Sequence, residues 1–177
     1  SNATTSLLVP ALIASAIRFG ISLTVVEAPF GQVMQEALDP DSPINQGELD
    51  GVLLALDYRG LSFSDVLSIN SSDTSSLSAD VKDYIDLLIE KFNNGGSRVV
   101  IVQTIPQPTE GLFGSYDARM VSSMQRQTQA FNSYLAELPQ ESGTVVLDVA
   151  KLANRVGLDR WHDPIQWNFA KLPFSQR

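Results

Sequence analysis

The residue best suited to acid–base chemistry is His162, the one histidine of the chain. It lies between Asp159 and Asp163, after the last predicted strand. A carboxylate three residues upstream in an irregular turn can fold back and accept the Nδ1 proton, which leaves Nε2 free as a general base. Asp163 could take that part instead. A histidine that is bonded to a neighbouring acid only for local stability is the commoner case, so both interpretations stay open.

Three further residues follow predicted strands and could bind a substrate. Gly31 opens a short helix, so its N–H could point at a developing oxyanion, or it is a plain turn glycine. Asp57 could bond a neighbouring loop, or cap the turn that follows it. Arg59 could bind an anionic group, although an ion pair with Asp57 is the commoner fate of such an arginine.

Composition excludes several classes of function. The chain has 177 residues, which is the size of one domain, and its net charge of -8 would repel nucleic acid and anionic lipid. Because cysteine is absent and histidine occurs once, a metal site would have to consist mainly of carboxylates, and we expect none. No glycine-rich phosphate loop occurs, so we also expect no cofactor in this domain. No segment is predicted to span a membrane, and a cytoplasmic protein is the default.

The aliphatic pattern predicts an α/β fold. Four short aliphatic runs predict strands at residues 21–28, 48–57, 97–105 and 144–149, and helical patterns cover residues 5–20, 78–92 and 117–138. Unbroken aliphatic runs are typical of strands that are buried on both faces of a parallel sheet. The alternation therefore predicts a three-layer fold, whose ligands bind outside the carboxyl ends of the strands.

The ends of the chain suggest a fragment. Residues 1–3 have the sequence of a scar left after tag removal, so we place the domain at residues 4–177. A helix ahead of the first predicted strand is unusual, and we expect that a first strand is truncated. The strands at 21–28 and 48–57 would then either pair directly or receive a segment from a second copy, as an exchanged homodimer. Residues 68–79 form a serine-rich polar loop, either a solvated linker or a mobile rim element.

Two stretches of the chain resemble a known family. Residues 157–162, Gly-Leu-Asp-Arg-Trp-His, resemble the last block of the SGNH (GDSL-type) hydrolases, in which an Asp-x-x-His pair serves a serine nucleophile. More specifically, residues 27–43 and 157–175 resemble the N-terminal domain of FkbH-like proteins. In that family an SGNH-like domain with a flavodoxin-like fold precedes a phosphatase-like domain of the haloacid dehalogenase superfamily, subfamily IIIC.

This resemblance implies a role in loading a glyceryl or acyl unit onto an acyl carrier protein for polyketide-type biosynthesis. It makes the carrier protein and the phosphatase-like domain the expected partners. His162 would be the base, Asp159 its orienting acid and Gly31 an oxyanion donor, with a Ser or Thr upstream as the nucleophile of acyl transfer. SGNH hydrolases usually carry an Asn after a central strand, in the third of their sequence blocks. In this chain the stretch from Leu56 to Arg59 stands there instead. That departure favours a second interpretation, a non-catalytic docking scaffold, and a third is a free-standing esterase.

Overall fold

The computed structural model describes residues 1–63, 77–138 and 143–175 of the chain. The elements in chain order are α1 (Leu8–Ile17), α2 (Val33–Leu38), α3 (Pro43–Gln46), β1 (Gly51–Leu54), the 3-10 helix η1 (Tyr58–Gly60), α4 (Ala79–Asn93), β2 (Val99–Gln103), the 3-10 helix η2 (Gly114–Arg119), α5 (Met124–Ala136), β3 (Thr144–Leu147), α6 (Val149–Val156), α7 (Leu158–Trp161) and α8 (Pro164–Ala170). Most of the predicted loop at 68–79 lies outside the described residues.

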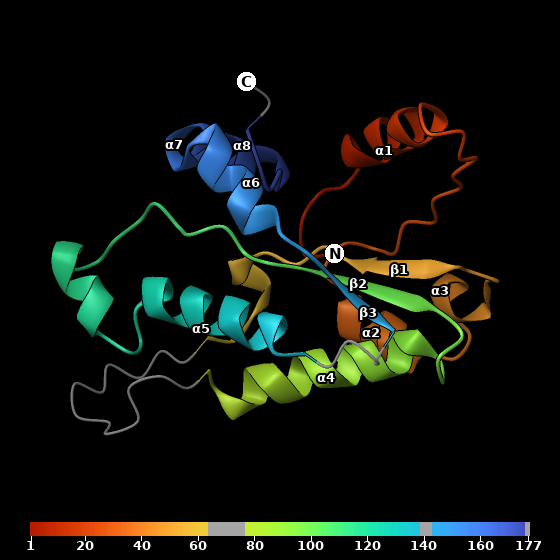
Figure 1. Cartoon of the computed structure of the whole chain (residues 1–177), viewed down its shortest axis with the longest axis horizontal. Helices are drawn as coiled ribbons and strands as arrows, with labels where there is room; N and C mark the ends of the chain where they lie inside the picture. Colours follow the sequence, from red (N-terminus) through yellow and green to blue (C-terminus); the bar gives the residue numbers. More distant parts are fainter. Residues whose placement is uncertain (64–76, 139–142, 176–177) are drawn as a thin grey trace.

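The sheet is parallel, with the strand order β1-β2-β3 (Figure 1). Val52 lies opposite Val100, and Val102 lies opposite Val146. Three of the four predicted strands are therefore confirmed, each somewhat shorter than its aliphatic run.

The predicted strand at residues 21–28 is wrong, because the structure has irregular backbone there. A β-rich sequence forms a strand only where a neighbouring strand supplies backbone partners. Among the described residues none pairs with this segment, so direct pairing with the 48–57 strand, one of the two expected alternatives, is not formed.

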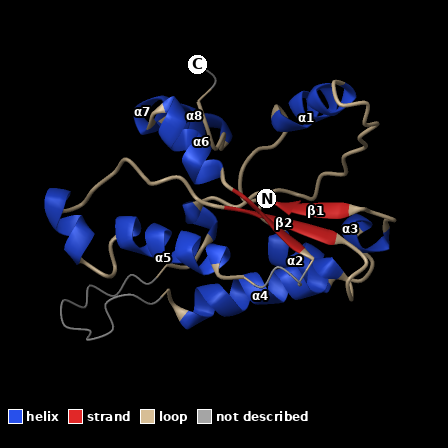
Figure 2. Ribbon diagram, in the orientation of Figure 1, coloured by secondary structure: helices blue, strands red, loops and turns tan. Residues whose placement is uncertain are grey.

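Helices cover both faces of the sheet, which gives three layers (Figures 1 and 2). Helices α2, α4 and α5 lie on one face, and α1 lies with α6, α7 and α8 on the other. The arrangement agrees with the predicted three-layer α/β class. No helix in the described ranges is long and apolar enough to cross a membrane.

The hydrophobic core lies between the sheet and the α4–α5 layer. Val81, Ile85 and Leu88 recur at helical spacing on α4 and are almost fully buried, as is Phe131 on α5. Helix α4 is capped at its C-terminus by Asn94, which adopts a left-handed backbone conformation with φ 49°. These contacts account for the well-packed half of the molecule.

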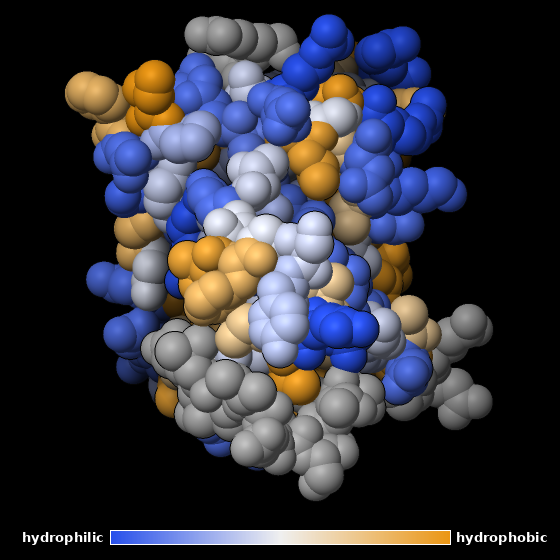
Figure 3. Space-filling view, turned by 90° about the vertical axis from the view of Figure 1, so that its left-hand side faces the viewer, coloured by the Kyte–Doolittle hydropathy of each residue, from blue (hydrophilic) through white to orange (hydrophobic). Residues whose placement is uncertain are grey.

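The opposite face of the sheet is covered less completely. Helix α1 has no buried residue, and Val145 in β3 is 51% exposed. The prediction that the strands are buried on both faces is therefore wrong for β3. In the ribbon view, α1 stands off the sheet (Figure 1). On another side of the molecule, hydrophobic residues occur in small patches among hydrophilic ones (Figure 3).

Candidate functional site

A largely apolar cavity of about 470 Å³ lies over the less covered face of the sheet. Its wall comes from α1, from the carboxyl ends of β1, β2 and β3, and from the C-terminal helices. The apolar lining includes Leu8, Leu12, Leu53, Leu147, Leu152 and Trp161. Polar groups also reach the wall, namely Tyr58, Gln103, Arg160 and His162. The cavity thus lies at the edge of the sheet where ligands of parallel α/β folds bind.

His162 is held by a backbone group of a different element. It is the C-terminal cap of α7, and its Nε2 lies 3.0 Å from the carbonyl oxygen of Gln107, in the segment that follows β2. Because a carbonyl only accepts, this hydrogen bond requires a proton on Nε2. In the neutral ring Nδ1 is then the basic nitrogen, so the expectation of a free Nε2 is not met.

The predicted pairing of His162 with an acid is not formed either. Asp159 lies exposed in the first turn of α7, and within the described ranges no hydrogen bond joins it to the imidazole. Asp163 instead caps α8, with its Oδ1 accepting from the N–H groups of Ile165 and Gln166, each at 3.1 Å. The physical reason is that this stretch folds as two short helices, where the prediction assumed an irregular turn.

Asp57 and Arg59 take the structural roles that were the commoner alternatives. Asp57 accepts the backbone N–H of Arg59 at 2.7 Å and its guanidinium at 2.6 Å, so it is both a turn cap and an ion-pair partner. The guanidinium also stacks between Tyr58 and Trp167, at 4.2 and 4.1 Å from their ring centroids. This stack ties α8 to the end of β1.

Asn2 completes the hydrogen bonding around Asp57. Its side-chain amide donates to the Asp57 carboxylate at 3.2 Å and accepts the Asp57 backbone N–H at 2.9 Å. A side chain at Gly60 would collide with Asn2, whose amide carbon lies 2.6 Å from the position of such a Cβ. Residues 1–3, interpreted from the sequence as a scar, therefore pack closely against the end of β1.

Tyr58 presents a protonated phenol to the cavity. Burial raises the pKa of Tyr58 to about 12, because the charged form loses hydration. The charge of Arg59 lowers this pKa, and the carboxylates of Glu110 and Asp57 raise it. Its hydroxyl donates to the Glu110 carboxylate across a long contact of 3.4 Å. At neutral pH this phenol is thus a hydrogen-bond donor.

Gly31 does not offer a free N–H to an oxyanion. Its backbone has φ +73°, a conformation that favours glycine, and its N–H donates to the carbonyl oxygen of Ser1 at 3.0 Å. Gly31 precedes α2, as predicted, but it is not part of the cavity wall beside His162. The oxyanion role would require this bond to Ser1 to break.

Two hydroxyl groups share the cavity wall with His162. The Thr4 hydroxyl donates to the carbonyl oxygen of Ala170 at 2.6 Å, and the Thr5 hydroxyl donates to the Glu27 carboxylate. Neither hydroxyl donates to the imidazole. A nucleophile at either position would have to give up its present partner first.

The sequence pattern missed the polar residues at the strand ends. Gln103, the last residue of β2, donates to the Leu56 carbonyl oxygen at 3.0 Å and reaches the cavity. Thr104 donates to Asp148 at 3.1 Å, which joins the end of β2 to the start of α6. The signal was present, since each is a polar residue directly after an aliphatic run. No group of three metal-ligating side chains occurs in the described part of the chain.

The comparison with family models decides the relationship. The model described as FkbH, N-terminal domain, matches residues 1–176. The chain belongs to the FkbH N-terminal domain family. This match begins at residue 1, so Asn2 lies within the matched range of the FkbH N-terminal domain. No curated protein matches the chain.

A solved structure supports the fold of this FkbH N-terminal domain. The chain is similar to the crystal structure of the N-terminal part of the protein BF1531 from Bacteroides fragilis, described as containing a phosphatase domain and complexed with Mg. The TM-score is 0.81 at 24% sequence identity, over 98% of this chain and 45% of the other. The present chain thus spans less than half of that relative.

Proposed function

We propose that this SGNH-like domain takes part in loading a glyceryl or acyl unit onto an acyl carrier protein, for polyketide-type biosynthesis. In this proposal the cavity beside His162 holds the thioester-bearing pantetheine arm of the carrier protein, while a phosphatase-like domain of the same polypeptide handles the phosphorylated precursor. Membership of the FkbH family supports the assignment to such a protein.

The observation that carries the proposal is the cavity itself. Its volume of about 470 Å³ falls in the range of about 300–1,000 Å³ that is typical of small-molecule sites. An apolar wall suits an acyl chain, and the second amide hydrogen of Gln103 and the Nδ1 acceptor of His162 suit the carbonyl and amide groups of a thioester arm.

The experiment is a titration with a glyceroyl-pantetheine thioester, followed by the fluorescence of Trp161. Trp161 lines the cavity, and Trp167→Phe removes the only other tryptophan. We expect saturable binding that Leu152→Gln weakens at least tenfold, because this side chain lines the cavity and is already 50% exposed. Leu112→Gln is the matched control, since Leu112 is 81% exposed and lies outside the cavity wall.

A second candidate, a non-catalytic docking scaffold, is favoured by the hydrogen bonding of His162. Its Nε2 is taken by Gln107, and the hydroxyls of Thr4 and Thr5 donate elsewhere. A scaffold would bind an intact carrier protein or the phosphatase-like domain with equal affinity in wild type and Leu152→Gln, and would not bind the free thioester. That pair of results would reject the cavity proposal in favour of the scaffold.

A further inference from the structure

Arg160 brings a positive charge without an anionic partner to the wall of the larger cavity. It lies in α7, is exposed, and lines the cavity beside Trp161 and His162. Within the described ranges its guanidinium makes no hydrogen bond, ion pair or ring contact. The acidic side chain of this wall, Asp57, is already paired with Arg59 at 2.6 Å. The described part of the wall therefore offers an unmatched cation at its α7 side.

The backbone that carries Arg160 is held from several sides. Its N–H donates to the carbonyl oxygen of Gly157 at 3.0 Å, and the N–H of Ser175 donates to the carbonyl oxygen of Trp161 at 2.7 Å. The rings of Trp161 and Phe174 also pack together, with their centroids 5.9 Å apart. Little ordering of the main chain is then needed when the guanidinium binds a ligand, which lowers the entropic cost of binding.

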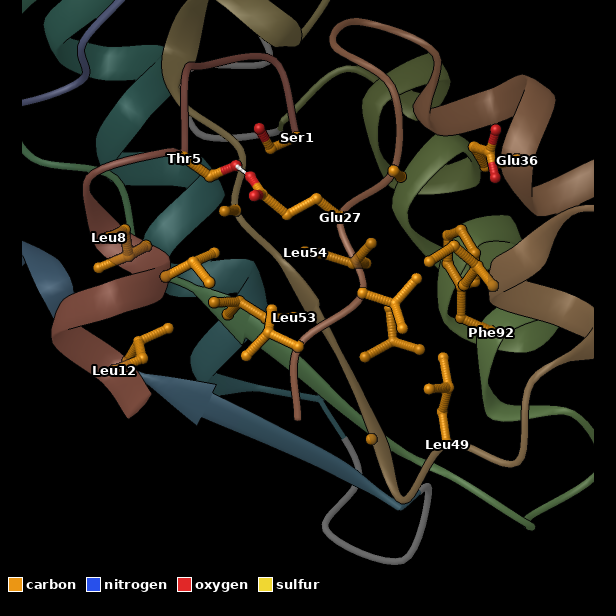
Figure 4. A pocket seen from close by; sticks show the side chains of 18 of the residues that line it. Ser1, Thr5, Leu8, Leu12, Glu27, Glu36, Leu49, Leu53, Leu54 and Phe92 are labelled. Atoms are coloured by element: carbon orange, nitrogen blue, oxygen red, sulfur yellow. Dashed lines mark hydrogen bonds between the residues drawn. The ribbon is translucent and has the colours of Figure 1, made fainter. Parts of the chain in front are cut away.

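The side of the cavity nearest α1 and β1 has the opposite charge. A smaller space of about 200 Å³ adjoins the cavity there, and Leu8 and Leu53 line both (Figure 4). The charged side chains described around this smaller space are the carboxylates of Glu27 and Glu36. An anionic group is therefore repelled on this side and attracted by Arg160 on the other.

The chemistry of the arginine side chain indicates the kind of ligand group. The chain has a net charge of -8, so its overall field does not gather anions, and a local cation is needed to hold one. A guanidinium presents its N–H groups in a planar fork that fits two oxygens of a phosphate or carboxylate. A largely apolar cavity with an exposed arginine in its wall thus fits a ligand whose neutral part enters the cavity and whose anionic group stays at the surface.

We propose that Arg160 binds the phosphate group of the pantetheine arm and so determines which end of the arm enters the cavity. This inference rests on the proposed function, because it takes the arm to be the ligand of the cavity. A carrier protein holds the arm through a phosphodiester, which is the anionic group of the arm and lies at its outer end. With the phosphate bound at the exposed Arg160, the neutral thioester end enters the apolar part of the cavity.

The test compares glyceroyl-pantetheine with glyceroyl-phosphopantetheine, which differ only in the phosphate. Isothermal titration calorimetry measures the binding of both compounds to the wild type, Arg160→Gln and Arg160→Lys. We expect the wild type to bind the phosphorylated compound at least tenfold more tightly than the other. Arg160→Gln should abolish this preference, and Arg160→Lys should keep part of it, since lysine has the charge without the planar fork. All three proteins should bind glyceroyl-pantetheine equally, which also verifies that the variants fold.

Arg155→Gln is the matched control. Arg155 is exposed on α6 and lies outside the cavity wall, so its replacement removes the same charge from a neighbouring helix. This variant should keep the full preference for the phosphorylated compound. Added salt should reduce the preference of the wild type, because it screens an exposed ion pair.

Three results would overturn the role of Arg160. Equal binding of both compounds by the wild type, or a preference that Arg160→Gln retains, would show that this side chain does not bind the phosphate. A preference that Arg155→Gln abolishes as completely would assign it to the general charge of the C-terminal helices. In each case glyceroyl-pantetheine still binds, so the cavity proposal stands. Binding of neither compound would reject the cavity proposal and this inference with it.

Discussion

Nε2 of His162 lies 3.0 Å from the main-chain oxygen of Gln107, so the one imidazole of the chain joins the turn between α7 and α8 to the segment that follows β2. This bond crosses from the C-terminal helices to the sheet. It fixes the proton on Nε2 of the neutral ring and directs any base function to Nδ1. The same contact that makes His162 part of the cavity wall therefore limits the chemistry it can do.

Replacing His162 by alanine should destabilise the domain. We expect the free energy of unfolding to fall by about 1–2 kcal/mol, because the part-buried hydrogen bond to the Gln107 carbonyl is lost. His162→Gln keeps an N–H donor on a side chain of similar length and should recover part of the loss. Urea denaturation of the three proteins measures this. Equal stability of wild type and His162→Ala would show that the bond to Gln107 contributes nothing.

The stack of Arg59 between Tyr58 and Trp167 gives a second prediction. Arg59→Ala should cost about 1–2 kcal/mol, since it removes a charge-assisted bond to Asp57 and two cation–π contacts. Arg59→Lys keeps the charge but not the planar guanidinium, so it should recover less than half of that loss. The exposed Arg18 offers a control, and Arg18→Ala should change stability by no more than about 0.5 kcal/mol. Full recovery by lysine would contradict the importance of stacking.

Asn2 gives a prediction about the first residues of the chain. Asn2→Ala leaves both the Asp57 carboxylate and the Asp57 N–H without this partner, and should cost about 1–2 kcal/mol. Ser22→Ala, in the exposed segment after α1, is the control and should be neutral. Thermal or urea unfolding would decide. An unchanged midpoint for Asn2→Ala would support the interpretation of residues 1–3 as a scar that the fold does not use.

The raised pKa of Tyr58 predicts a loss of stability in alkaline solution. In the unfolded chain the phenol has a pKa of about 10, and in the folded protein burial raises the pKa to about 12. The folded state then binds more protons between these values, so the free energy of unfolding falls as the pH rises from about 10 to about 12. Below pH 10 the contribution is fully present. Denaturation as a function of pH should show this slope, and Tyr58→Phe should reduce it.

The strands were predictable from the sequence where a neighbouring strand exists. The runs around Val52, Val100 and Val146 pair with one another, whereas the β-rich residues 21–28 have no strand partner among the described residues. Pairing is a property of the whole sheet, so a local pattern could not distinguish these cases. The ion pair of Asp57 and Arg59 was predictable because the two residues are close in sequence.

The partner of His162 was not predictable in the same way. Gln107 is 55 residues away in the chain and contributes a backbone oxygen, which has no signature in the sequence. The helical fold of α7 also removed the turn on which the pairing with Asp159 depended. Spacing in sequence therefore located His162 at the correct edge of the sheet but could not give its hydrogen bond.

Ester hydrolysis provides the sharpest test of catalysis by this domain. A serine-type mechanism needs a hydroxyl that donates to the imidazole and an acid that orients the ring. Here the hydroxyls of Thr4 and Thr5 donate to other acceptors, and Asp159 does not contact His162. We therefore expect no turnover of a short activated ester above the buffer rate.

The control for this assay is His162→Ala, with folding verified by circular dichroism. Any background hydrolysis from surface groups should be the same in the variant and the wild type. Turnover that His162→Ala abolishes, and that Thr4→Val or Thr5→Val also abolishes, would show that one of these hydroxyls is a working nucleophile. In that event the imidazole must exchange its bond to Gln107 for one to the threonine, and the hydrogen bonding seen here would be that of a resting state.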